Sequence, residues 1–343
     1  MRHQRVASAM TLPVVIAVVA MASALVEGQA SNGAAARNAP AGTAGARKWT
    51  VPRTPDGQPD LQGIWDYRTA TPLERPRELA GREFLTAVEV AAFERRAAER
   101  EDGRPPEDGR SDPSVHPVWW LDYGKQVVGS MRSSLIVDPA DGRIPPLAAE
   151  AQKRAADRRA ARVGRGPADA AEDRSLWERC ITRGLPEGML PAGYNNNVQF
   201  VQTPGYVVIV SEMIHDARIV PLDGRPHLPS GVQQWTGDSR GRWEGDTLVV
   251  ETTNFSDKAN FRGSGASLRL IERFTPTDAR TIEYRFTVED PSTWPTPWTV
   301  TFPLVKSDQP MYEYACHEGN YGLTHMLGNA RAEERAAGAD RRK

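Results

Sequence analysis

A short segment near the carboxyl end of the chain gathers more groups able to bind a ligand or transfer a proton than any other stretch. Residues 312–322 read YEYACHEGNYG, and the polar side chains of interest are Cys316, His317, Glu318, Asn320 and Tyr321. An imidazole next to a carboxylate is suited to acid and base catalysis. Neighbours on an extended strand face opposite sides, so this pair needs a turn at Cys316 to act in one site.

The sequence has two cysteines, Cys180 and Cys316, and a disulfide between them is the simplest expectation for an exported chain. The bond would close a long loop, for which the chain-entropy model allows up to ~5 kcal/mol of stabilisation. Two buried free thiols and a reactive Cys316 are the alternatives. A disulfide would leave the chemistry of this segment to His317 and Glu318.

The amino terminus has the pattern of a secretory signal peptide. Arg2 and Arg5 precede an uncharged apolar run over residues 6–26, and small residues follow up to Ala30. We expect cleavage near Ala30, a flexible leader over 31–50, and a periplasmic or secreted protein without a stable membrane span. Retention of the run as a membrane anchor is the alternative.

The overall charge is nearly balanced, with 43 Lys and Arg against 44 Asp and Glu. Charge therefore gives no reason to expect nucleic acid or an anionic membrane as a partner. The expected partner is a small-molecule ligand or substrate.

Two carboxylates fall on apolar faces of predicted strands. Glu272 alternates with Leu270 and Phe274, and Glu212 continues the alternation of residues 206–210. Burial would raise the pKa of either carboxyl toward the range used in acid and base catalysis. The alternative is a glutamate at a strand end that reaches solvent or an arginine.

A third group of candidates lies between two predicted strands. His215 beside Asp216 is a candidate oriented imidazole, and Arg218 is suited to bind an anionic substrate group. A turn held by ion pairs among Asp216, Arg218 and Glu212 is the alternative. The predicted catalytic residues are His215, Glu212, Glu272, His317 and Glu318.

Amide and aromatic side chains are candidates for substrate binding, and these are Asn197, Trp235, Trp298 and Tyr321 in addition to Arg218. The alternatives are a structural loop for the asparagines and core positions for the tryptophans. No His-x-His, His-Glu-x-x-His or Cys-x-x-Cys spacing is present, so we expect no metal or other cofactor. Gly-x-Ser-x-Gly, phosphate-loop and dinucleotide motifs are also missing, which argues against a serine hydrolase, an NTPase and a Rossmann oxidoreductase.

The elements that must position these residues are mostly short strands. Residues 199–203 and 206–210 predict a hairpin, because Pro204-Gly205 suits the centre of a type II turn. Other strands are expected at residues 61–67, 126–137, 218–222, 247–254, 268–274, 281–288, 298–304 and 312–315, with a turn at 238–241. This pattern predicts a mainly β protein, an antiparallel barrel or closed sandwich.

We expect one β-rich domain over residues 51–335, with its main strands over 198–316. Peripheral helices are expected over 147–163 and over 86–100, where Thr86 and Glu89 form a capping-box pattern. Residues 336–343 are expected to be a disordered tail.

Several strings resemble a widespread set of secreted hypothetical proteins of soil bacteria. They are SSLIVDPADGRIPPL (133–147), GMLPAGYNNN (188–197), MIHDARIVPLDGRPH (213–227), GDSRGRWEGDTLVVETTNF (237–255) and YACHEGNYG (314–322). The resemblance implies export but no particular activity. The β-rich half is also similar to a lipocalin-type, calycin-like barrel in its strand pattern.

Two functions follow as hypotheses. The first is a cofactor-free lyase, isomerase or hydrolase that acts on a small organic or sugar-like substrate in a pocket of the barrel. The second is a non-catalytic periplasmic ligand-binding protein with the same fold.

Overall fold

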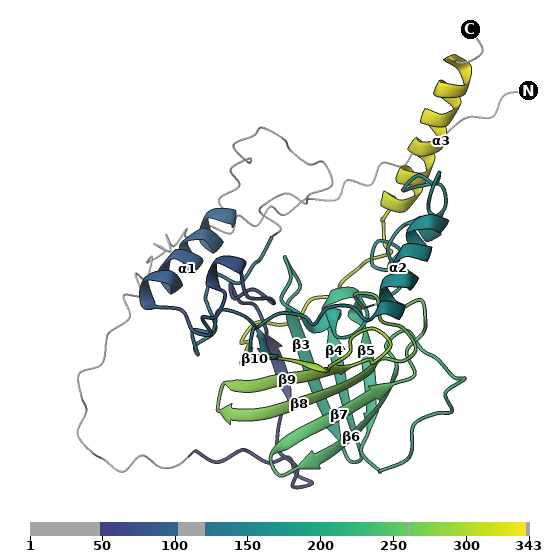
Figure 1. Ribbon diagram of the computed structural model, residues 1–343. Coiled ribbons are helices and arrows are strands. Elements are labelled where there is room, and N and C mark those ends of the chain that lie inside the picture. Colours follow the sequence, from purple (N-terminus) through teal and green to yellow (C-terminus); the bar gives the residue numbers. More distant parts are fainter. Residues whose placement is uncertain (1–48, 102–120, 260, 341–343) are drawn as a thin grey trace, which may run out of the picture. The chain divides into compact units, whose positions relative to one another are not determined.

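The computed structural model of the chain describes residues 49–101, 121–259 and 261–340 (Figure 1). Their centre is a 10-stranded antiparallel sheet in the order β5-β4-β3-β1-β10-β9-β8-β7-β6, with β2 paired to β10. The strands are β1 (Gly63–Asp66), β2 (Ile136–Asp138), β3 (Asn197–Thr203), β4 (Tyr206–Ser211), β5 (Ala217–Pro221), β6 (Asp238–Glu244), β7 (Thr247–Thr253), β8 (Arg269–Asp278), β9 (Thr281–Glu289) and β10 (Trp298–Lys306). The predicted signal peptide and nearly all of the predicted leader lie outside the described residues.

Alternation of apolar and polar side chains explains why these segments form strands with one buried face. On β9, Ile282, Tyr284, Phe286 and Val288 are completely buried, and the residues between them point to the other face. Phe302 of β10 lies opposite Tyr284 in the register and faces the same interior.

The sheet curls until its two outer strands, β5 and β6, approach each other. Gly241 of β6 packs so closely on this seam that an added Cβ would lie 2.7 Å from side-chain atoms of both Val220 and Leu222. The absence of a side chain at Gly241 therefore permits the close approach. The predicted mainly β fold with an antiparallel barrel and a few helices is confirmed.

Aromatic rings fill the interior of the barrel. Phe274 stacks on Tyr284 with ring centroids 4.7 Å apart, and the edge of Phe200 meets Phe274 at 5.0 Å. Phe302 packs edge-on against Tyr284 at 5.2 Å. The interior is thus a close-packed core, and it differs from the hollow lumen in which lipocalins hold a ligand.

Three α-helices accompany the sheet in the described part of the chain: α1 (Ala87–Glu101), α2 (Ala149–Ala161) and α3 (Gly322–Asp340). At the start of α1, the backbone N–H of Thr86 donates to Glu89 at 2.9 Å and that of Glu89 donates to the Thr86 hydroxyl at 3.3 Å, the expected capping box. None of the helices in these ranges is long and apolar enough to cross a membrane.

Several details differ from the sequence-based expectations. The strand expected over residues 126–137 is limited to β2, and the helix α3 was not expected. The segment 238–241, predicted as a turn, begins β6, because Ser239 finds a partner in Thr252 of β7 at 2.9 Å. Residues 312–315 form no strand, and the last strand of the sheet ends at Lys306. The predicted tail is helical up to Asp340, since its alanines and charged residues favour continuation of α3.

The predicted disulfide is confirmed. Cys180 and Cys316 are bonded, with Cα atoms 5.8 Å apart and a sequence separation of 136 residues. The bond ties the segment after β10 to the segment between α2 and β3. Cys316 is therefore a structural residue rather than a nucleophile.

Candidate functional site

Two of the predicted site residues meet inside the barrel. Arg218 of β5 donates to Glu272 of β8 through both terminal nitrogens, one at 3.1 Å, and the Tyr284 hydroxyl donates to the same carboxylate at 2.8 Å. The side chains of Arg218 and Glu272 are 3% and 0% exposed. Burial, together with the negative Glu272, raises the pKa of Tyr284 well above its usual value. The cluster connects β5 to β8 across the barrel interior, and both carboxylate oxygens of Glu272 accept hydrogen bonds within it, whereas the Arg218 Nε atom is buried without a partner.

Two more predicted residues, Asn197 and Glu212, which were expected in separate roles, meet where β3 begins and β4 ends. The side-chain amide of Asn197 donates to Glu212 at 2.8 Å, and the backbone N–H of Glu212 donates to the Asn197 carbonyl at 3.0 Å. Glu212 is 6% exposed. The carboxylate thus holds the strand ends together.

The predicted His215–Asp216 dyad does not form a hydrogen bond. The backbone is left-handed at Ile214 (φ 58°) and His215 (φ 47°), and the imidazole is exposed. The Asp216 carboxylate turns away and accepts from the Thr182 hydroxyl at 2.7 Å. Burial raises the pKa of Asp216 above its usual value.

The remaining predicted residues lie apart from one another. His317 and Glu318 are exposed, and Tyr321 is exposed and stacks on His325 with centroids 6.0 Å apart. Trp298 is completely buried in the core. The structure therefore supports the core alternative for Trp298.

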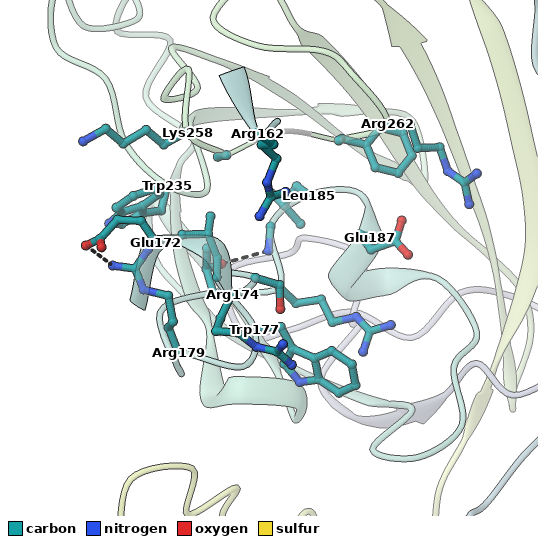
Figure 2. A pocket seen from close by; sticks show the side chains of 17 residues that line it. Arg162, Glu172, Arg174, Trp177, Arg179, Leu185, Glu187, Trp235, Lys258 and Arg262 are labelled. Atoms are coloured by element: carbon teal, nitrogen blue, oxygen red, sulfur yellow. Dashed lines mark hydrogen bonds and ion pairs between the residues drawn. The ribbon is translucent and has the colours of Figure 1, made fainter. Parts of the chain in front are cut away.

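A pocket of about 1140 Å³ lies outside the barrel interior (Figure 2). It is lined by three segments: residues 162–187 between α2 and β3, Trp235 between β5 and β6, and four residues between β7 and β8, namely Lys258, Ala259, Phe261 and Arg262. We call it the arginine pocket, and its lining is Arg162, Glu172, Arg174, Ser175, Leu176, Trp177, Arg179, Thr182, Arg183, Gly184, Leu185, Glu187, Trp235, Lys258, Ala259, Phe261 and Arg262. Trp235 is the residue that the sequence-based prediction and this lining share.

A single helical turn builds the first wall of the pocket. Ser175 and Glu178 form a reciprocal capping box, with backbone N–H to side-chain distances of 2.9 and 3.1 Å. The turn presents Trp177, and the guanidinium of Arg183 lies over its ring, 4.5 Å from the centroid. The contact from Thr182 to Asp216 fixes this wall to the segment between β4 and β5.

The second wall consists of two loops that are hydrogen-bonded to each other. The backbone N–H of Gln234 donates to the Asn254 carbonyl at 2.9 Å, and that of Ser256 donates to the Gln234 carbonyl at 2.9 Å. These bonds hold Trp235 close to the loop that carries Lys258 and Arg262. Phe261 in that loop stacks on Trp298, the first residue of β10, at 5.9 Å, which anchors the wall to the barrel core.

Most charged side chains in the lining of the arginine pocket are cationic, and three of its arginines contact neighbouring carbonyl or carboxylate groups. Arg162 donates to the Asp173 carbonyl at 2.9 Å, Arg174 pairs with Glu178, and Arg179 lies 3.8 Å from Glu172. These arginines were not among the predicted site residues, because they lie in irregular segments without a recognisable motif. The high number of arginines close to Trp177 in the sequence could have indicated this part of the lining. No sequence signal indicates that Lys258 and Arg262 lie near the same pocket.

The described residues contain no cluster of three or more His, Cys, Asp or Glu side chains that is arranged to hold a metal ion. Comparison with protein-family models, curated proteins and solved structures finds no match for this chain. The geometry and charge of the pocket therefore carry the functional assignment.

Proposed function

We propose that the protein is an exported, non-catalytic ligand-binding protein that holds a small organic molecule in the arginine pocket. The observation that carries this proposal is the pocket of about 1140 Å³ with aromatic and cationic side chains on its walls. Sites for small organic ligands combine such concave, partly apolar surfaces with a few convergent polar groups. Loops mounted on a packed barrel are a suitable frame, because the barrel fixes where the loops begin and end.

The acid and base hypothesis has weaker support. His215, His317 and Glu318 are exposed, and no contact joins them in the described part of the chain. Glu272 and Glu212 are buried but hydrogen-bonded to Arg218 and Asn197. A general base must reach the proton that it removes, and these carboxylates face the core instead of the pocket.

Export is part of the proposal. The Cys180–Cys316 disulfide supports it, because such bonds persist in oxidising compartments outside the cytoplasm. The motifs that resemble secreted proteins of soil bacteria support the same assignment. We propose that the chain belongs with that set.

The binding proposal is testable with a library of small organic acids, alcohols and sugars, scored by tryptophan emission. Ligand-induced changes should be lost in Trp177→Phe/Trp235→Phe and retained in Trp49→Phe, since Trp49 lies outside the arginine pocket. If the ligand-induced change in tryptophan emission persists in Trp177→Phe/Trp235→Phe, the ligand binds outside the arginine pocket.

The competing enzyme hypothesis needs a turnover assay on every compound that binds. His215→Ala/His317→Ala should bind these compounds as the natural protein does, and no compound should be converted by either protein. Turnover that the double variant abolishes would establish the enzyme instead.

A further inference from the structure

The charges of the arginine pocket do not cancel. Its lining has six cationic side chains, Arg162, Arg174, Arg179, Arg183, Lys258 and Arg262, and two carboxylates, Glu172 and Glu187. Asp173 and Glu178 also pair with lining arginines. Counted against these four carboxylates, the six cationic side chains leave a net surplus of two positive charges. Such a surplus favours a ligand with about two negative charges.

The surplus charge belongs to particular side chains. Within the described ranges, no carboxylate forms an ion pair with Arg183, Lys258 or Arg262. The Arg183 guanidinium lies 4.5 Å from the centroid of Trp177, and that of Arg262 lies 5.7 Å from that of Phe261. A guanidinium over a ring keeps the N–H donors at its edge available for an acidic group.

These cations are spread around the pocket. In Figure 2, Lys258 and Arg262 lie on opposite sides, and Arg162 lies between them. The backbone at Arg262 is left-handed (φ 50°), a conformation that costs free energy for a residue other than glycine and that concentrates at functional sites. Separated cations match two separate acidic groups better than one compact anion.

Aromatic side chains stand beside the cations on both walls. Trp177 lies on the first wall, and Trp235 and Phe261 lie on the second. Trp235 is 37% exposed, so part of its ring is available for contact. Flat apolar ligands are held by such rings, because stacking buries apolar surface with favourable quadrupole geometry.

We propose that the arginine pocket selects aromatic dianions, which are flat ring systems with two separate acidic groups. This inference rests on the proposed binding function. Arg183, Lys258 and Arg262 bind the acidic groups, and Trp235 contacts the ring.

The test is isothermal titration calorimetry with four probes. Naphthalene-2,6-dicarboxylate carries both features, its monomethyl ester has one charge, its dimethyl ester has none, and adipate has two charges without a ring. A hydrogen bond between charged groups is strong enough that the dicarboxylate should bind at least about tenfold more tightly than the monoester. This advantage should decrease at high salt, which screens exposed charges.

Two sets of variants separate charge from stacking. Lys258→Gln/Arg262→Gln should remove the advantage of the dicarboxylate over its monoester. The control Lys153→Gln/Arg158→Gln, which removes two exposed cations of α2, should preserve it. Trp235→Ala should weaken the dicarboxylate about tenfold and leave adipate unchanged, because base and ring stacking on an aromatic side chain is of this size.

The outcomes distinguish this inference from the proposed function. If the dimethyl ester binds in the pocket as tightly as the dicarboxylate, the dianion inference is wrong and the binding function stands. If neither the probes nor any library compound binds, both are wrong. An equal loss of affinity in the control variant Lys153→Gln/Arg158→Gln would also overturn the inference. The preference for the dicarboxylate would then come from the overall positive charge and not from Lys258 and Arg262.

Discussion

At the scale of single residues, the buried ion pair inside the barrel has the largest expected effect. Replacing Glu272 by Leu leaves Arg218 buried without a counter-charge, which costs about 3 to 5 kcal/mol. Urea denaturation measures this loss. The combined replacement Arg218→Met/Glu272→Leu/Tyr284→Phe should recover most of it, because it also removes the Tyr284 hydroxyl that donates to Glu272 and so leaves no member of the cluster without a partner. A loss below about 1 kcal/mol for Glu272→Leu would contradict the proposed role of the pair.

Asp216 gives a prediction for the pH dependence of stability. Its folded-state pKa is raised by burial from the usual 3.8, so the folded protein binds the proton more tightly than the unfolded chain does. Its contribution is therefore largest below the unfolded pKa and is lost as pH rises through the raised value. Asp216→Asn should gain stability relative to the natural protein as pH rises from acid to neutral.

Asp238 provides a control of opposite sign. Although burial opposes it, hydrogen bonds from Leu228 and His227 lower the pKa of Asp238. Its contribution is present above the unfolded pKa and lost as pH falls through the lowered value. Asp238→Asn should therefore lose stability at neutral pH, with a smaller difference in acid. Parallel pH trends in the denaturation of the two variants would refute the assignment.

The buried or exposed face of a residue could be predicted where side chains alternate along a strand. Alternation placed Glu272 on the buried face, and the alternative of an arginine partner was also recognisable from the sequence. The His215–Asp216 dyad failed for a local reason. Ile214 and His215 both have a left-handed backbone conformation and form a turn there. Neither residue type is one that commonly adopts this conformation, so the turn could not be predicted.

At the scale of elements, the Cys180–Cys316 disulfide connects the pocket to the segment after β10. For a loop of 136 residues, the chain-entropy model assigns the bond up to about 5 kcal/mol. Cys180→Ser/Cys316→Ser should lower the urea midpoint by a corresponding amount. Because Cys180 lies between Arg179 and Arg183, the same variant should also bind pocket ligands more weakly. Unchanged stability and affinity would contradict this role.

Strands in which apolar and polar residues alternate could be predicted from the sequence. Elements that are stabilised by contacts with distant segments could not. The strands β7 to β10 lie within a few residues of their predicted positions, because each has a continuous apolar face. β6 was missed, because Asp238, Ser239 and Gly241 are turn-type residues whose partners lie on other segments. The whole of α3 was missed, because its start follows the loop that holds Cys316 rather than a visible capping motif.

At the scale of the whole described molecule, stability and binding are assigned to different parts. The barrel interior is filled by aromatic rings and a buried ion pair, whereas the arginine pocket is made by loops outside it. Its lining comes from three segments that are distant in the sequence. Their convergence is a tertiary effect, which explains why sequence reasoning found Trp235 but not the surrounding cations.

The most direct test of ligand binding in the arginine pocket is a crystal structure of the protein with a brominated naphthalene dicarboxylate, located by anomalous scattering from bromine. We expect a bromine peak in the arginine pocket beside Trp235, with the carboxylates near Lys258 and Arg262. A peak inside the barrel, near Glu272, would contradict it. So would ligand bound only at residues outside the pocket lining.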